Sequence, residues 1–72
     1  MDIIYIDSEY ITLNQFLKIV SLISSGGQAK FFLENNDVYV NQIIESRRGK
    51  KIYDGDIIKI EDKIFMIKNE IK

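Results

Sequence analysis

Residues 47–51 place four positive charges in five positions, in the order Arg-Arg-Gly-Lys-Lys. An arginine guanidinium offers a planar fork of N–H donors and a lysine ammonium a point charge, and both bind phosphate oxygens. The run therefore indicates a site that holds phosphate groups. The alternative is a solvated loop between two strands, which is what most charge runs are.

A second group of residues, at 25–30, could also approach a phosphate. Gly26 and Gly27 precede a helical pattern, so their backbone N–H groups would lie at the positive end of a helix dipole. Lys30 should face outward on that helix. A tight turn between two helices also needs glycine, so both interpretations of the pair stay open. Neither the G-x-G-x-x-G nor the G-x-x-x-x-G-K-[ST] pattern of nucleotide-binding loops is present.

Aromatic and acidic residues give weaker signals. Phe31 and Tyr39 could stack on unpaired bases, but we expect both side chains to be partly buried. The acidic residues Asp54, Asp56 and Asp62 match no calcium loop, and the first of them precedes a glycine in a turn signal. We interpret these carboxylates as turn residues and expect no metal site.

The chain contains neither His nor Cys. Imidazole and thiolate metal ligands, disulfides and cysteine nucleophiles are therefore excluded. The Ser, Lys and acidic residues form no recognisable catalytic constellation. We predict that the protein is not an enzyme and uses no cofactor and no small-molecule substrate.

Length and composition describe one domain. Seventy-two residues with 46% hydrophobic content, largely Ile, can fold around a thin aliphatic core. Net charge is −1, but residues 12–51 hold six basic against three acidic residues, between flanks of −3 (1–11) and −1 (52–72). No run approaches the roughly 20 apolar residues of a membrane span, and no signal peptide is recognisable. We expect a cytoplasmic protein that does not bind membranes.

The first half of the chain predicts one strand and one helix before the glycine pair. Residues 2–6 are rich in β-branched side chains and indicate a short strand. A helix should begin at Thr12, which can form a capping box with Gln15. Its apolar stripe follows the helical period: Leu13, Phe16, Leu17 and Val20.

A second helix should begin near Gly26. Ser25 and Gln28 repeat the capping-box spacing, and three apolar residues give the helix a core face: Ala29, Phe32 and Leu33. Asn35-Asn36 should end it, since Asn tolerates the left-handed conformation that stops helices. Two helices joined by so few residues should pack as a helical hairpin.

The second half predicts strands separated by turns. The strands are expected at 38–40, 43–44, 56–60 and 63–67, with turns at Asn41-Gln42, 54–55 and 61–62 and a polar loop at 47–51. The resulting fold class is α+β, a two-helix hairpin packed on a small, mostly antiparallel sheet in a single domain spanning 1–72.

Five segments together resemble one family. They read ITLNQFLK at 11–18, SGGQAKF at 25–31, DVYVN at 37–41, RRGKK at 47–51 and DGDII at 54–58. The chain resembles the RNA-binding domain named after ribosomal protein S-four, and within it the stand-alone YaaA-type bacterial subgroup. The resemblance covers residues 11–60 in order and spacing.

This resemblance implies the αL RNA-binding motif, with a surface made from the second helix, the loop before it and the strand–strand loops, used on structured ribosomal or transfer RNA. Carried over position by position, the RNA-binding candidates are Ser25, Gly26, Gly27, Gln28, Lys30, Asn41, Arg47, Arg48, Lys50 and Lys51. Two positions depart from the family pattern. Many members have Ser-Arg at the glycine pair, so an arginine contact is lost here, and most have Asn-Gly at Asn41-Gln42.

Two hypotheses follow. The first is a non-catalytic RNA-binding module that docks on ribosomal RNA or a ribosome precursor. If all four cations of 47–51 neutralise phosphates, log K should fall against log salt with a slope of about −3 to −4. The second is a protein–protein interaction module of the ribosome-assembly machinery, with ribosomal proteins as partners of an exposed strand edge or apolar patch.

Overall fold

The computed structural model describes residues 1–70, so the last two residues of the predicted domain lie outside the described range. The elements in chain order are β1 (Asp2–Ile6), β2 (Tyr10–Thr12), α1 (Leu13–Ile19), the short 3-10 turn η1 (Gly26–Gln28), α2 (Ala29–Asn35), β3 (Val38–Val40), β4 (Ile43–Ile44), β5 (Lys51–Tyr53), β6 (Ile57–Ile60) and β7 (Lys63–Asn69). Helices and strands thus follow the predicted α+β order.

Helix α1 begins where its capping residues place it. The backbone N–H of Gln15 donates to Oγ1 of Thr12 at 3.2 Å, and the backbone N–H of Thr12 donates to Oε1 of Gln15 at 2.8 Å. The predicted capping box is confirmed. Leu13, Phe16 and Leu17 are fully buried, so the apolar stripe forms the centre of the core.

The prediction of a second capping box, between Ser25 and Gln28, is wrong. Ser25 precedes η1 but its side chain makes no cap hydrogen bond. Oε1 of Gln28 instead accepts from the backbone N–H of Ser24 at 2.6 Å and from its hydroxyl at 3.1 Å. The first turn is wound as a 3-10 helix, which is tighter than the α-helical turn that a capping box spans. The same residue spacing therefore gives a different contact.

Helix α2 ends at Asn35 as predicted, but for a different reason. Asn36 has an extended backbone, with φ of −140°, rather than a left-handed one. The side-chain amides close the helix instead. Nδ2 of Asn35 donates to the carbonyl of Phe31 at 2.8 Å, and Nδ2 of Asn36 to that of Phe32 at 3.0 Å. These bonds satisfy carbonyls that have no partner within the helix.

Five strands form one sheet in the order β1-β7-β6-β3-β4. Only β1–β7 is parallel, and the other three pairs are antiparallel, so the mostly antiparallel sheet is confirmed. The β3–β4 hairpin turns at Asn41 and Gln42, which have φ of 52° and 72°. Positive φ at both central residues is typical of a type I′ turn.

Two strands were not foreseen. β2 and β5 pair antiparallel in a sheet of their own, with Thr12 opposite Lys51 and Tyr10 opposite Tyr53. Lys51, predicted to lie in the polar loop, is therefore the first residue of a strand. The two paired segments lie about 40 residues apart in the chain. Local sequence patterns cannot predict a pairing between such distant segments.

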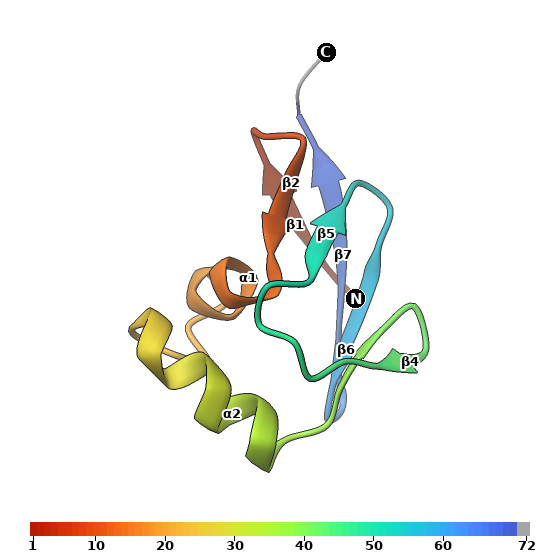
Figure 1. Ribbon diagram of the computed structural model, residues 1–72. Helices are drawn as coiled ribbons and strands as arrows, with labels where there is room; N and C mark the ends of the chain where they lie inside the picture. The colour runs from red at the N-terminus through yellow and green to blue at the C-terminus, as the bar shows by residue number, and fades with distance from the viewer. Residues whose placement is uncertain (71–72) are drawn as a thin grey trace.

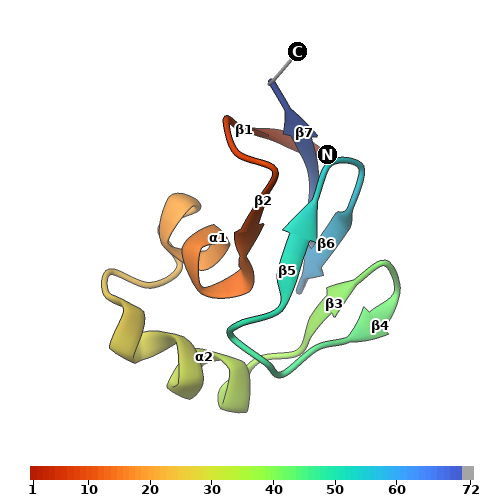
Figure 2. The ribbon, with the colours of Figure 1, turned by 45° about the horizontal axis from the view of Figure 1, so that its top comes forward.

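The molecule has two layers over one core. The helices and the β2–β5 pair cover one face of the five-stranded sheet (Figures 1 and 2). α1 contacts η1 within this layer. The ring of Phe16 on α1 packs edge-on against Phe65 on β7, with centroids 5.2 Å apart. The opposite face of the sheet, here called the outer face, is not covered by any element of residues 1–70.

Candidate nucleic-acid interface

Residues 47–50 of the cationic run lie in the segment that connects β4 to β5, here called the basic loop (residues 45–50), and Lys51 begins β5. Its backbone is fastened to α1. The carbonyl oxygens of Lys50 and Arg48 accept hydrogen bonds from the backbone N–H groups of Leu13 at 2.8 Å and Asn14 at 2.9 Å. These two N–H groups belong to the first turn of α1 and have no partner within the helix. The basic loop therefore has a fixed path along the start of α1.

One of the four cations is paired. Glu45 accepts bonds from Nε and Nη2 of Arg47 at 3.1 and 3.2 Å and from the backbone N–H groups of Ser46 and Arg47. The Arg47 guanidinium lowers the pKa of Glu45 below its ordinary value, while Glu45 raises the pKa of Arg47. Arg47 still has free N–H donors, since its side chain is 75% exposed. The positive charge of Arg47, however, is balanced by the negative charge of Glu45.

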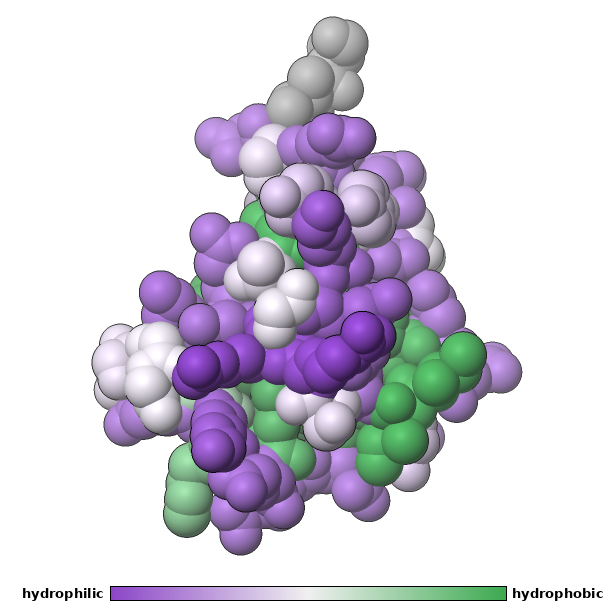
Figure 3. Space-filling view, viewed as in Figure 1, coloured by the Kyte–Doolittle hydropathy of each residue, from purple (hydrophilic) through white to green (hydrophobic). Residues whose placement is uncertain are grey.

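The other three cations have no acidic partner within ion-pair distance among the described residues. Arg48 and Lys51 are exposed and Lys50 is partly buried. Figure 3 shows strongly hydrophilic atoms in a band across the segment that joins β4 to β5, with hydrophobic atoms gathered beside β4. The basic loop and Lys51 thus carry a net charge of +3, one less than the sequence run alone implied.

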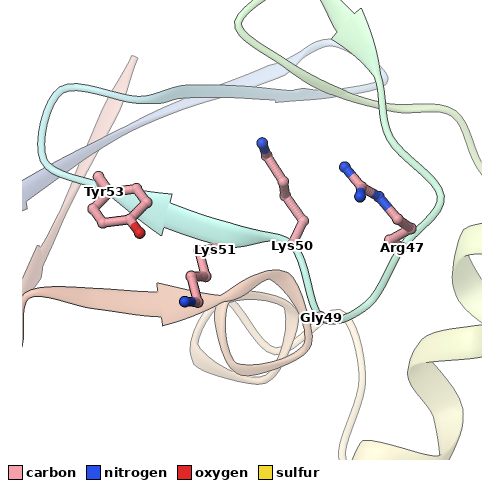
Figure 4. Close-up of a pocket in the computed structure, with 5 residues that line it drawn as sticks. All are labelled: Arg47, Gly49, Lys50, Lys51 and Tyr53. Carbon is pink, nitrogen blue, oxygen red and sulfur yellow. The ribbon is translucent and has the colours of Figure 1, made fainter.

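A hollow of about 560 Å³ opens beside the basic loop. In Figure 4, Arg47 and Lys50 project to one side of the chain, while Lys51 and Tyr53 lie farther along β5 on the other side. The residues that line the hollow are Arg47, Gly49, Lys50, Lys51 and Tyr53. Cationic groups therefore surround a space that a phosphate group could enter.

Asn14 joins the basic loop to the start of the second helix. Its backbone N–H binds the loop carbonyl of Arg48, and its side chain lies against Gly26, where an added Cβ would come within 3.3 Å of Nδ2. A side chain at position 26 would therefore make a tight contact with Asn14. Oδ1 of Asn14 is buried without a hydrogen-bond partner among the described residues. Asn14 thus contacts both the basic loop and η1.

The remaining candidates of the 25–30 group differ in their surroundings. Gly27 faces open space, with no atom within 4 Å of an added Cβ, and Lys30 is exposed on α2. Ser25 is exposed, and Gln28 is engaged with Ser24. Since α2 has only seven residues after η1, its dipole adds little to phosphate binding.

Asn41 lies apart from these residues. Its Nδ2 donates to Oδ1 of Asp56 at 3.0 Å, and its Oδ1 accepts the backbone N–H of Ile57 at 3.0 Å. Both ends of the amide thus hold the β3–β4 hairpin to the start of β6. The β3–β4 turn lies on the other side of the basic loop from α1 and α2 (Figures 1 and 2).

The prediction for Phe31 is wrong, and two aromatic residues were missed. Phe31 is 69% exposed because α2 buries Ala29 and Leu33 on the opposite side. Tyr39 is partly buried as expected. Tyr10 and Tyr53 stand side by side on β2 and β5, with ring centroids 5.6 Å apart. Their alternation with buried Ile11 and Ile52 was the available signal.

The acidic residues 54 and 56 act in turns, as predicted. Oδ1 of Asp54 accepts the backbone N–H of Asn69 at 2.7 Å, and Oδ2 of Asp56 that of Tyr53 at 2.8 Å. Within residues 1–70, no three acidic, His or Cys side chains are grouped so that they could hold a metal ion. No described helix is long and apolar enough to cross a bilayer.

Comparison with known proteins gives two matches. A family model described as "S4 domain" matches residues 4–68. The chain is also 53% identical over 58 residues to the "Probable ribosome maturation protein RlbA" of Bacillus subtilis (strain 168), an alignment that covers 81% of this chain and 82% of that protein. With a match over nearly its whole length, on a fold that places a cationic loop beside two helices, this chain belongs to the S4 domain family.

Proposed function

We propose that this protein is a non-catalytic module that docks on structured RNA, either ribosomal RNA or a ribosome precursor. The observation that carries the proposal is the group of three cations, Arg48, Lys50 and Lys51, which have no acidic partner within ion-pair distance among residues 1–70. The backbone carbonyls of the first two accept hydrogen bonds from α1, and the third pairs with β2. The family and the printed name of the Bacillus relative support the same role. The site of action would be the cytoplasm.

The geometry of double-stranded RNA explains why such a surface suits it. A-form RNA has a deep, narrow major groove that side chains cannot read, so proteins bind its phosphates, ribose hydroxyls and loops. A loop that already follows a fixed path loses little conformational entropy when it binds. The surface therefore favours recognition of RNA shape over recognition of base sequence.

Each candidate residue has a proposed part in this surface. Arg48, Lys50 and Lys51 neutralise phosphates, and Arg47 adds hydrogen bonds with little net charge. We propose that α1 and α2 act as the helical hairpin of the αL motif, with its RNA-facing side formed by Ser25, Gly26, Gly27, Gln28 and Lys30. Asn41 contributes by holding the β3–β4 hairpin in place.

Salt dependence tests the proposal directly. With three phosphates neutralised, log K for a fluorescent RNA hairpin should fall against log salt with a slope of about −2 to −3. This is shallower than the four-cation estimate, because Arg47 is paired with Glu45. The measurement is fluorescence anisotropy between 50 and 300 mM KCl, a range chosen on the basis that counterion release dominates there.

A matched pair of double variants locates the surface. Arg48→Ala with Lys50→Ala should weaken binding at about 150 mM salt on the order of 30-fold and flatten the slope by about 2. Lys59→Ala with Lys68→Ala removes the same charge from the outer face, where these exposed lysines lie on β6 and β7. Equal losses from both double variants would refute the assignment to the basic loop.

The outer face favours a second candidate function, in protein binding. It presents apolar side chains from all five strands, namely Ile3, Tyr5, Tyr39, Ile44, Ile57, Ile64 and Met66. Lys59 and Lys68 are the charged strand residues on this face within the described chain. Charge complementarity indicates a partner whose apolar patch is edged by carboxylates.

Purified ribosomal proteins, tested one at a time by biolayer interferometry, provide the probes. Ile64→Lys should abolish capture of a true partner while the affinity for RNA stays within about 2-fold, since the substitution leaves the basic loop untouched. A partner that binds Ile64→Lys as well as the parent protein does not use this face.

A further inference from the structure

The hollow beside the basic loop has an aromatic wall as well as cationic ones. The ring of Tyr53 borders it together with Lys50 and Lys51 (Figure 4). Tyr53 is 42% exposed, although its neighbour Ile52 is fully buried. A nucleotide combines an anionic phosphate with a flat aromatic base, and the two kinds of wall match these two parts.

Tyr10 and Lys51 determine which tyrosine is available. Tyr10 stands opposite Tyr53 in the β2–β5 pair, and the Lys51 ammonium lies 4.9 Å above the centroid of the Tyr10 ring. One side of Tyr10 is therefore occupied by a cation–π contact. The cross-strand pair explains why Tyr53 stabilises the small sheet. It does not account for the part of the Tyr53 ring that borders the hollow.

Gly49 is one of the residues that line the hollow. An added Cβ at this position would meet no atom within 4 Å, and the backbone of Gly49 does not have positive φ. Neither packing nor backbone conformation within the described chain thus requires glycine here. Gly49 therefore lines the hollow without a side chain, next to Lys50.

We infer that the Tyr53 ring stacks on one unpaired base of the bound RNA, with the phosphate of that nucleotide bound by Lys51, which lies on the same side of β5 as Tyr53 (Figure 4). This inference rests on the proposed RNA binding and specifies its target: a helix interrupted by a bulged or looped-out nucleotide. A base inside a duplex is stacked on its neighbours and presents no free face to the tyrosine. The preferred RNA is therefore neither a plain duplex nor a plain single strand.

Two RNA hairpins test this inference. They are identical except at one bulged position, which holds 2-aminopurine in one and an abasic site in the other. The parent protein should bind the base-containing hairpin about 5- to 10-fold more tightly, the lower part of the range for stacking of one base on an aromatic ring. Stacking should also quench the 2-aminopurine fluorescence.

Three variants separate stacking from folding. Tyr53→Leu should lose the preference for the base-containing hairpin, and Tyr53→Phe should keep it, because Phe retains the ring. Tyr5→Leu, which removes a 59% exposed tyrosine from the outer face, should behave as the parent protein. Thermal unfolding of each variant shows whether the β2–β5 pair is intact. If Tyr53→Leu does not fold, the binding of the two hairpins by the parent protein still tests the inference, because equal binding of both overturns it.

The outcomes distinguish this inference from the proposed function. A parent protein that binds both hairpins equally, or a Tyr53→Leu variant that keeps the preference, overturns the stacking while leaving the salt-dependent binding through Arg48 and Lys50 intact. Equal weakening of Tyr53→Leu on both hairpins means that Tyr53 acts only in folding, and this also overturns it. Failure of the parent protein to bind any hairpin overturns both proposals.

Discussion

The two faces of this molecule are built from similar strands but expose different chemistry. On the helical side, the basic loop and Lys51 carry three cations without an acidic partner among the described residues, and the loop backbone is hydrogen-bonded to α1. On the outer face, Ile64, Lys59, Tyr39 and Ile44 lie side by side across four strands. The comparison shows that positive charge is concentrated in the connection between β4 and β5. The strands of the sheet themselves present mainly apolar side chains on both sides.

The two faces share one core, and the largest predicted effect concerns that core. Phe16→Ala should lower the free energy of unfolding by about 3–5 kcal/mol, because the ring is fully buried against Phe65. A domain of this size has roughly 4–11 kcal/mol in total. Urea unfolding followed by circular dichroism measures the change, and RNA binding should fail in the same urea range.

Ile44→Ala is the matched control for this prediction. Ile44 is 56% exposed on the edge strand β4, so its truncation should change the free energy of unfolding by less than about 0.5 kcal/mol. If Phe16→Ala abolished RNA binding without changing the unfolding transition, the two faces would not depend on a common core.

A second prediction increases the charge on the helical side alone. Glu45→Gln should release Arg47, tighten RNA binding about 5-fold at 150 mM salt and steepen the log–log slope by about 1. Asp7→Asn removes the same negative charge from the exposed β1–β2 connection, at the end of the molecule away from α2 (Figure 1), and should change neither quantity. Fluorescence anisotropy measures both. Weaker binding by Glu45→Gln would mean that Glu45 matters more for the path of the loop than for its charge.

The sequence predicted what depends on local pattern. The Thr12–Gln15 box, the stripe on α1, the order of elements and the turns at Asn41-Gln42 and Asp54-Gly55 follow from neighbouring residues, and the structure contains them. The second capping box failed although its spacing is identical. Its first turn is a 3-10 turn, and Gly26 in that turn lies against Asn14, a tertiary contact that neighbouring residues do not predict.

The charge and the aromatic residues of the interface were less predictable. The charge count of the sequence treated Arg47 as unpaired. In the structure Arg47 bonds to Glu45, two residues away, and this bond requires the loop to fold back on itself. The Tyr10–Tyr53 pair depends on a strand pairing between distant segments. Phe31 is a different case. It lies off the apolar stripe of α2, so the sequence itself contained the information against its predicted partial burial.

A third prediction concerns the turn of the β3–β4 hairpin, from which the chain continues into the basic loop. Gln42 has φ of 72°, a region that side chains disfavour and glycine occupies freely. Gln42→Gly should therefore raise the free energy of unfolding by about 0.5–1 kcal/mol, measured in urea, with RNA affinity unchanged.

Asn41→Gly provides the contrast within the same turn. Its φ of 52° is also positive, but the substitution removes the bonds to Asp56 and Ile57. It should destabilise the protein despite the better backbone fit. Stabilisation by both substitutions would mean that backbone strain outweighs the Asn41 hydrogen bonds.

The smallest predicted effect is a pH dependence that belongs to the basic loop and not to the outer face. The hydrogen bonds from Arg47 hold the pKa of Glu45 below its ordinary value, so Glu45 binds its proton less readily in the folded than in the unfolded protein. Its contribution is therefore complete above the ordinary glutamate pKa of about 4.3 and is lost as pH falls through the lowered folded value. The difference in stability between the parent protein and Glu45→Gln should accordingly be constant from pH 7 to 5 and shrink below pH 4. A difference that stayed constant down to pH 2 would show that the Glu45–Arg47 pair does not contribute to folding.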